Sequence, residues 1–482
     1  MAISRRLINE PSSQIFEEIA KVMNYPARSF VSHIDRDEVI DDLAKLVSYP
    51  SCSFDGYDIE PSLACAAEVK RMVEAAGFTH VEMLDVGGRA PVVWAQHHAN
   101  AERYPDAPTL LLYAHYDIQP APIEEQGWES DPFELTLRDN GRYYGRGSAD
   151  NKAGIVGHLH AIEAAGGLEA LGHVNLKICF EGEEECFGTL EDYIATDPHR
   201  FEADAFLIFD MGSDEVGRPM LGTALRGTVL VDVEVDTIKQ ALHSGVYGGP
   251  TPDALTGLIT MLSTLWDVSG DVAIEGLKSF EWDGAPYLEE RFRRDVGLLE
   301  GADLVGTGPL HDRIIGRPSA TIIGLDATSV AESSNVIVPS AKARISVRFP
   351  YGQSTDQVLD AVTTHLKKNA PKGMIMNIVK TSGASAFMTD IDGPLAKRFA
   401  ESMAEVFDSE VTAVGGGASI PLLASLQEVS PDADFLLYGV SDRELSNMHG
   451  GNESVDPGEL VNTIKTEATF FKKLEEESVE KP

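Results

Sequence analysis

Acidic residues and a histidine follow three apolar segments of this chain. The segments LLLYAHYD, KICFEGEEE and AFLIFD end on His115 and Asp117, on Glu184 and Glu185, and on Asp210. In open α/β sheets ligands bind beyond the C-terminal ends of the strands, so such residues can converge on one crevice. A cluster of His, Asp and Glu without a thiolate suits Zn²⁺, Mn²⁺ or Co²⁺. The three segment ends therefore predict a divalent metal centre.

A further carboxylate, Asp150, lies in the turn-rich segment GRGSADNKAG, and the enlarged set of ligands favours a site with two metal ions. Each element alone has a simpler interpretation. Asp117 could cap an ordinary turn, and EGEEE could be an acidic patch that opens a helix. The order and the context of the elements decide between these interpretations.

The elements that must position these residues alternate between strand and helix. APTLLLYAHYD is an apolar run bounded by turn residues, which is typical of a strand buried on both faces. The helical pattern IVGHLHAIEAAGGLEALG follows, then the strand HVNLKICFEGEEE, the helix TLEDYIATDP and the strand ADAFLIFD. This alternation predicts an α/β catalytic domain whose largely parallel sheet is flanked by helices.

The pattern changes after Gly222. LRGTVLVDVEVDT alternates apolar and polar residues with a period of two, which indicates a half-exposed antiparallel strand, and AKARISVRFP resembles it. The α/β pattern resumes with GPLAKRFAESMAEVF and DADFLLYGV. We therefore expect a catalytic domain in two parts, 1–222 and 383–482, interrupted by a smaller α+β domain over 223–382.

Composition excludes several classes of function. Of 482 residues 43% are hydrophobic and 24% charged, and the net charge of -38 would repel nucleic acid and anionic membranes. The four cysteines form no CxxC pair, and no run of about 20 apolar residues is present to span a bilayer. The N-terminus lacks the apolar stretch of a secretory signal. We expect a cytoplasmic protein with neither nucleic acid nor membrane as a partner.

Taken in order, these motifs resemble the M20 family of metallopeptidases, in particular its cytosolic, carnosinase-like dipeptidase branch. The resemblance covers positions from about 110 to 455 and rests on the stretches LLLYAHYDIQP, WESDPFELTLRDNGRYYGRGSADNKAG, FEGEEECFGTL, FDMG, LHSGVYGG, SNVIVPSAKARISVRF, GGGASIP and MHGGNES. It implies hydrolysis of an amide bond in a small substrate, most simply a dipeptide. It also implies a homodimer formed through the inserted lid or dimerisation domain.

The resemblance also implies a set of metal ligands. His115 and Asp210 would bind one metal, Glu185 and His449 the other, and Asp150 would bridge both. The metals would be two divalent ions, zinc in the first place, with manganese or cobalt as alternatives. Many relatives carry a second Asp where this chain has Asn151, and the family usually has a cis peptide bond at this position.

Two further carboxylates have implied roles beside the metals. Asp117 would accept a hydrogen bond from the His115 imidazole and fix its tautomer. Glu184 would be the general base that takes a proton from a water activated between the two metals. The family's acid pair directly precedes a short segment with glycine, so the resemblance selects the last two of three consecutive glutamates and leaves Glu183 without a role.

Four residues are implied to meet the substrate. His243 would stabilise the developing oxyanion in the active site of the other subunit, whereas Asn335 and Arg348 would contact the substrate and Ser419 would line the substrate pocket. Arg348 suits a terminal carboxylate, which it can hold by a two-pronged ion pair. An ordinary surface ion pair on a strand is the alternative for this arginine.

One departure from the family pattern bears on the substrate. Carnosinase-like relatives have an Arg-Glu pair where this chain has Gly415 and Gly416, and that glutamate is a candidate for holding a free substrate amine. An N-acyl amino acid needs no such anchor. An N-acyl amino acid deacylase or desuccinylase on the same scaffold is therefore the alternative to a dipeptidase. A catalytically inactive binding protein is the alternative from another class.

Overall fold

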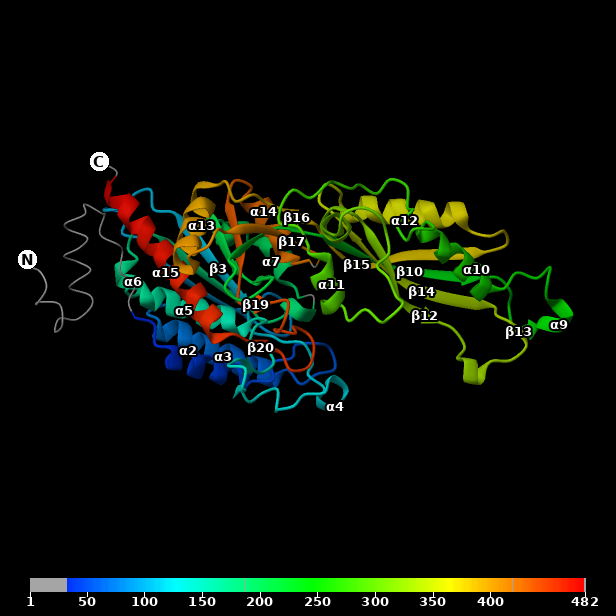
Figure 1. Ribbon diagram of the computed structural model, residues 1–482, viewed down its shortest axis with the longest axis horizontal. Helices are drawn as coiled ribbons and strands as arrows, with labels where there is room; N and C mark the ends of the chain where they lie inside the picture. Colours follow the sequence, from blue (N-terminus) through cyan, green and yellow to red (C-terminus); the bar gives the residue numbers. More distant parts are fainter. Residues whose placement is uncertain (1–32, 187, 418, 481–482) are drawn as a thin grey trace, which may run out of the picture.

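The computed structural model describes residues 33–186, 188–417 and 419–480, and the N-terminal segment on which the expectation about a secretory signal rests lies outside them. Two sheets dominate the described chain, and Figure 1 shows them at opposite ends of an elongated molecule. The larger sheet has helices on both faces, which confirms the predicted α/β architecture.

The larger sheet has nine strands, of which the central ones are parallel. Its strands, in spatial order, are β1 (Val81–Leu84), β2 (Val92–His97), β6 (Asn175–Glu181), β3 (Thr109–His115), β7 (Ala205–Phe209), β18 (Asp434–Tyr438), β9 (Met220–Leu225) and β16 (Phe387–Met388), with β17 (Thr412–Gly416) also paired to β9. β3 runs parallel to both β6 and β7, and β7 runs parallel to β18. The ends of β3, β6 and β7 therefore lie at one edge.

Strand β3 shows why this sequence builds a buried sheet. Leu110 and Leu112 belong to the core on one face, and Leu111 and Tyr113 belong to the core on the other. Alternate residues of a strand point to opposite faces, so a run of apolar residues needs a cover on both sides. The polar side chains begin only at His115, where the strand ends.

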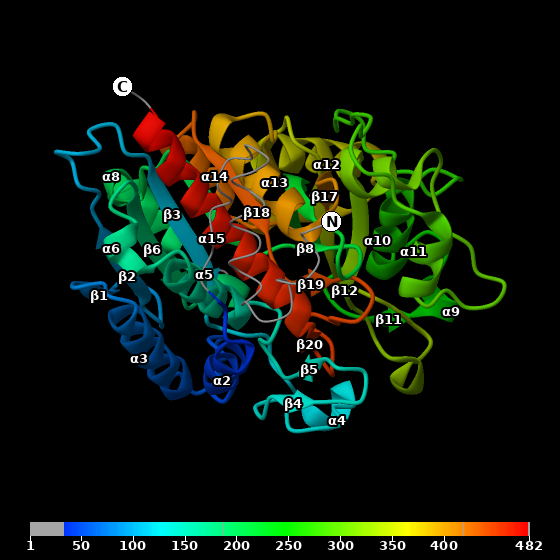
Figure 2. The same cartoon turned by 60° about the vertical axis from the view of Figure 1, so that its left-hand side comes forward.

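Helices supply that cover. One face carries α2 (Arg36–Val47), α3 (Glu60–Ala75), α5 (Lys152–Ala164), α13 (Pro394–Phe407) and α15 (Pro457–Glu480); the other carries α7 (Leu190–Thr196), α8 (Pro198–Phe201) and α14 (Leu422–Val429). Figure 2 shows α15 alongside α5 and α13. Over the described residues, no helix has both the length and the apolar character that crossing a membrane requires.

The smaller sheet is antiparallel throughout. Its strands are β12 (Ser319–Asp326), β14 (Ser340–Phe349), β10 (Gly227–Asp236) and β15 (Ile375–Ala384), in that order, and its helices are α10 (Ala254–Leu262) and α12 (Thr355–Asn369). The valines of β10 are fully buried under these helices. Asp232 on the opposite face is covered by Lys342 and Arg344, with ion-pair distances of 2.9 and 2.6 Å. The predicted alternation of β10 is therefore present.

The chain passes from the large sheet to the small one between Leu225 and Gly227, and returns between Ala384 and Phe387. A small ribbon of β11 (Leu242–His243) and β13 (Val336–Ile337), followed by α9 (Ser244–Tyr247), extends from the far end of the small sheet (Figure 1). Helix α11 (Glu289–Asp295) lies in the long connection from α10 to β12, and Figure 1 places it between the two sheets.

Short elements complete the described chain. They are α4 (Ile123–Gln126), β4 (Thr136–Leu137), β5 (Tyr143–Tyr144), α6 (Gly167–Ala170), β8 (Gly212–Ser213), β19 (Ser441–Asp442) and β20 (Ser454–Val455). β20 pairs with β5, which joins the C-terminal part of the chain to the loop before α5.

Candidate metal centre

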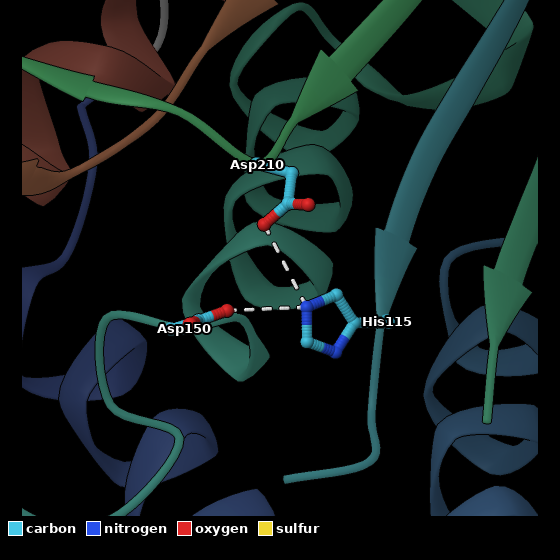
Figure 3. A group of neighbouring side chains, drawn as sticks. All are labelled: His115, Asp150 and Asp210. Atoms are coloured by element: carbon cyan, nitrogen blue, oxygen red, sulfur yellow. Dashed lines mark hydrogen bonds and ion pairs between the residues drawn. The ribbon is translucent and has the colours of Figure 1, made fainter. Parts of the chain in front are cut away.

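The first group of potential ligands gathers at the ends of β3 and β7. Nε2 of His115 lies 3.2 Å from Oδ1 of Asp150 and 3.6 Å from Oδ1 of Asp210. Figure 3 shows both carboxylates directed at the same ring nitrogen of His115. His115 is fully buried at the end of β3, Asp210 follows β7, and Asp150 comes from the turn before α5. Three separate elements thus converge on one point.

The second group shares Asp150 with the first. Nε2 of His449 lies 3.0 Å from Oδ2 of Asp150 and 3.3 Å from Oε2 of Glu185. In each group one ligand atom per residue can be chosen so that all lie within 4.8 Å of one another. Each oxygen of Asp150 therefore faces a different histidine, which is the arrangement of a carboxylate between two cation positions.

Asp117 positions the two glutamates that follow β6. Its carboxylate accepts the backbone N–H groups of Glu184 at 3.2 Å and of Glu185 at 3.0 Å, and Oδ1 lies 3.3 Å from Nδ1 of His115. Oε2 of Glu184 lies 3.9 Å from Nε2 of His115. Glu183 points elsewhere, because its carboxylate accepts the backbone N–H of Arg89 at 2.8 Å. The three consecutive glutamates thus have three different environments.

Electrostatics at the cluster favour added positive charge. Burial raises the pKa of Glu185 to about 8, and repulsion from Asp150 adds to this shift. Burial also raises the pKa of Glu184 well above its ordinary value, although His115 opposes the change. The hydrogen bond to Asp150 raises the pKa of His449 to about 9. Buried carboxylates are costly unless a cation offsets their charge.

The donors present fit a pair of divalent cations. Oε1 of Glu185 is buried without a hydrogen-bond partner among the described residues, so it is available as a ligand atom. Imidazole and carboxylate donors suit zinc and other first-row divalent ions. Asp150 belongs to both ligand groups. The site can therefore hold two cations around one shared carboxylate.

Two of the expected substrate contacts meet at the junction of the sheets. Nη1 of Arg348, on β14, donates to Oγ of Ser419 at 2.9 Å, and that hydroxyl donates to the backbone oxygen of Arg226 at 2.7 Å. No carboxylate forms an ion pair with Arg348 among the described residues. The surface ion pair that was the alternative for Arg348 is therefore absent among the described residues, and the guanidinium can bind an anion.

The other two expected contacts do not reach the cluster of their own chain. His243 and Asn335 are exposed on the ribbon of β11 and β13, where the Ser244 N–H donates to the Asn335 backbone oxygen at 2.9 Å. This ribbon lies at the end of the molecule farther from the large sheet (Figure 1). Within one chain the structure thus brings His243 to Asn335 but not to His115.

Supporting residues around the cluster were not predicted from the sequence. Nε2 of Gln119 donates to Oε2 of Glu185 at 2.7 Å, and Nδ2 of Asn151 donates to Oδ1 of Asp210 at 2.9 Å. The Asp150–Asn151 peptide bond is cis, as the resemblance implies. Asn151 adjoins the predicted ligand Asp150, and Gln119 lies four residues after the predicted ligand His115; this proximity in the quoted motifs was the only signal that could have marked them.

A family model matches most of the chain. Residues 111–473 match the model of peptidase family M20/M25/M40. The chain belongs to this family. The M20 peptidase is 39% identical over 375 residues to the cysteinylglycine-S-conjugate dipeptidase of Corynebacterium striatum, an alignment that covers 76% of this chain and 81% of that relative.

Solved structures support the same placement. The M20 family metallo-carboxypeptidase Sso-CP2 from Sulfolobus solfataricus superposes with a TM-score of 0.78 at 25% identity, over 91% of this chain and 99% of that one. Human carnosine dipeptidase 1 superposes with a TM-score of 0.70 at 25% identity, over 92% and 97%. The carnosinase-like resemblance and the metallopeptidase class are confirmed, which favours an enzyme over the inactive binding protein considered as an alternative.

Proposed function

We propose that this M20 peptidase hydrolyses the amide bond of a dipeptide at a centre of two divalent cations. The observation that carries the proposal is the position of Asp150, whose two oxygens face His115 and His449 at 3.2 and 3.0 Å. The names of two similar proteins, a cysteinylglycine-S-conjugate dipeptidase and a carnosine dipeptidase, support the substrate class.

The two ligand groups support one set of ligands for each cation. His115 and Asp210 would hold one and Glu185 and His449 the other, and Asp150 would serve both. Zinc is the first candidate for both positions, and manganese or cobalt would suit the same donors. When bound, such a pair supplies an activated water and polarises the carbonyl of the scissile amide.

Glu184 is the general base in this proposal. It lies beside the first ligand group without belonging to either group, and its backbone is fixed by Asp117. From this position its carboxylate takes a proton from the attacking water and passes it to the leaving amine. Asp117 also lies against Nδ1 of His115 and holds that imidazole so that Nε2 faces the ligand group.

Arg348 and Ser419 orient the substrate at its carboxyl end. The guanidinium of Arg348 is partly buried, which lowers its pKa, and among the described residues only its Nη1 makes a hydrogen bond, so its other donors could meet a carboxylate. A two-pronged contact with a terminal carboxylate would align the adjacent amide bond. A dipeptide whose carboxyl terminus is amidated should therefore be a poor substrate.

An N-acyl amino acid is the second candidate substrate, and one observation favours it. A Cβ on Gly415 would lie 2.6 Å from Ile315, and a Cβ on Gly416 would lie 2.8 Å from Leu225. A larger residue at either position would have to displace these side chains, and the strand end carries no acidic group that could hold a free amine. A deacylase or desuccinylase would not require that contact.

Metal removal and a substrate panel test the proposal together. Treatment with a chelator should reduce dipeptide hydrolysis to background, and two equivalents of Zn²⁺, Mn²⁺ or Co²⁺ should restore it. Release of amino acids is then measured from dipeptides, amidated dipeptides and N-acyl amino acids. Turnover of N-acyl amino acids alone would reject the dipeptidase proposal, and full activity in the metal-free protein would reject the metal centre.

We further propose that the region 223–382 forms a homodimer and brings His243 to the active site of the partner subunit. His243 is exposed, and its Nδ1 accepts the Gly245 N–H at 3.1 Å, which leaves Nε2 free to donate. A donor at that site would stabilise the oxyanion of the tetrahedral intermediate.

The His243→Ala variant should lose about 10²–10³ in kcat, the usual cost of removing one oxyanion donor, while it keeps two metals per chain. Steady-state kinetics and metal analysis measure the two quantities. His199→Ala is the matched control, because His199 is an exposed histidine elsewhere on the surface. Unchanged kcat in His243→Ala would reject a contribution across the dimer.

A further inference from the structure

Glu453 lies four residues after His449 and is completely buried. Oε1 of Glu453 accepts the backbone N–H groups of Ala149 at 2.9 Å and Asp150 at 3.1 Å. Oε2 accepts the backbone N–H of Gly147 at 3.0 Å. One side chain therefore fixes the main chain of the loop that presents the shared carboxylate.

The carboxylate of Glu453 also accepts from Arg146, whose Nη1 donates to Oε2 at 2.7 Å. Nη2 of the same guanidinium donates to the backbone oxygen of Gly450 at 2.9 Å. Gly450 is adjacent to His449, so the ion pair joins the loop of Asp150 to the loop of His449. The pairing of β20 with β5 runs beside this contact and holds the same two segments together.

The loop that carries His449 has an unusual backbone. Asn447, His449 and Asn452 have φ values of 49°, 62° and 58°, in the left-handed region that residues other than glycine rarely adopt. Such conformations persist only where the surroundings impose them. Two side chains impose this backbone. Arg146 donates to the backbone oxygen of Gly450, and Nε2 of Gln126 donates to the backbone oxygen of His449 at 3.3 Å.

Stability alone is a poor explanation for this arrangement. A buried ion pair loses so much hydration that an apolar replacement is often as stable. The pair of Arg146 and Glu453 is nonetheless almost wholly buried, with 1% and 0% of the side chains exposed, and every partner of Glu453 belongs to the loop before α5. Its contacts are directed at the position of Asp150.

We propose that Glu453 is a positioning residue that sets Asp150 and His449 in register, so that both ligand groups can share one carboxylate. The inference rests on the proposed two-cation function. It assigns no contact with substrate to Glu453. Because residues that orient metal ligands typically contribute 10–100-fold to metal affinity, the expected effect of losing Glu453 is of that size.

The test is the Zn²⁺ affinity of Glu453→Gln, measured by competition with a chromogenic chelator. The amide has one acceptor oxygen, so its NH₂ group must face N–H donors that the carboxylate now accepts. We expect affinity to fall about 10–100-fold. Glu467→Gln is the matched control. Glu467 lies on α15 and is equally buried, but its carboxylate accepts hydrogen bonds from His158 and Tyr438, neither of which belongs to a ligand loop. This variant should keep wild-type affinity even if the thermal stability of its metal-free form falls.

A second variant keeps the test decisive if Glu453→Gln does not fold. Glu453→Asp retains the charge opposite Arg146 but is one methylene shorter, so it cannot serve both sets of donors; its affinity should lie between those of wild type and Glu453→Gln. Wild-type affinity in a folded Glu453 variant would overturn the inference, and so would an equal loss in Glu467→Gln. A wild-type protein that binds no Zn²⁺, Mn²⁺ or Co²⁺ would instead overturn the proposed function.

Discussion

The Glu184→Gln variant should retain both metals and the native fold but lose about 10²–10⁴ in kcat, the range attributed to general acid–base catalysis. The substitution keeps the size of the side chain and removes only its capacity to take a proton. The backbone N–H of Glu184 still donates to Asp117, so the loop geometry should be preserved. Steady-state kinetics with a dipeptide, together with metal analysis, measure the effect.

The neighbouring glutamate provides the control for this experiment. Glu183 is also largely buried, but its carboxylate accepts the backbone N–H of Arg89 and faces away from the ligand groups. Glu183→Gln should therefore change kcat by less than tenfold, a difference below about 1.4 kcal/mol in activation free energy. A large loss in Glu183→Gln with little change in Glu184→Gln would show that the base is assigned to the wrong residue of the three.

The Asp150→Ala variant should have the largest effect, because both ligand groups lose a member. We expect fewer than two metals per chain and a loss of at least about 10³ in kcat/KM, since metal ions contribute several kcal/mol to the stabilisation of the transition state. The measurements are metal content after gel filtration and kcat/KM at saturating Zn²⁺.

Asp139→Ala is the comparison for Asp150→Ala. Asp139 is an exposed acid in the same connection between β3 and α5, so it controls for the loss of one negative charge from that connection. It should bind two metals and remain fully active. If Asp150→Ala also kept two tightly bound metals, a bridging role for this carboxylate would be excluded.

The strands that carry the site could be predicted from the sequence because each one is a continuous segment with its own pattern of apolar residues. β3 and β7 are short apolar runs, and each ends where a potential ligand begins, at His115 and at Asp210. Since parallel strands present their C-terminal ends at one edge, the meeting of these residues followed from the order of the elements. The assignment of Glu184 and Glu185 came from the resemblance, and the two residues have distinct environments.

The supporting contacts could not be predicted in the same way. In the sequence nothing distinguishes Glu453 from the many other acidic residues of the chain. The backbone N–H groups that it accepts lie more than 300 positions earlier. Nor does the sequence show that Arg348 contacts Ser419 while the ribbon of β11 and β13 lies at the far end of the smaller sheet. Such relations depend on how two sheets are set against each other. The proposed boundaries at 222 and 382 remain predictions for the same reason.

The two histidines of the cluster differ in their access to solvent, since the side chain of His115 is 0% exposed and that of His449 is 57% exposed. This asymmetry makes the two cation positions kinetically unequal. If both cations bind as proposed, an ion on the His449 side would exchange with bulk solution more readily than an ion beside the buried His115. Loading and depletion would then pass through a half-occupied species, in which the enclosed position is filled and the outer one is vacant.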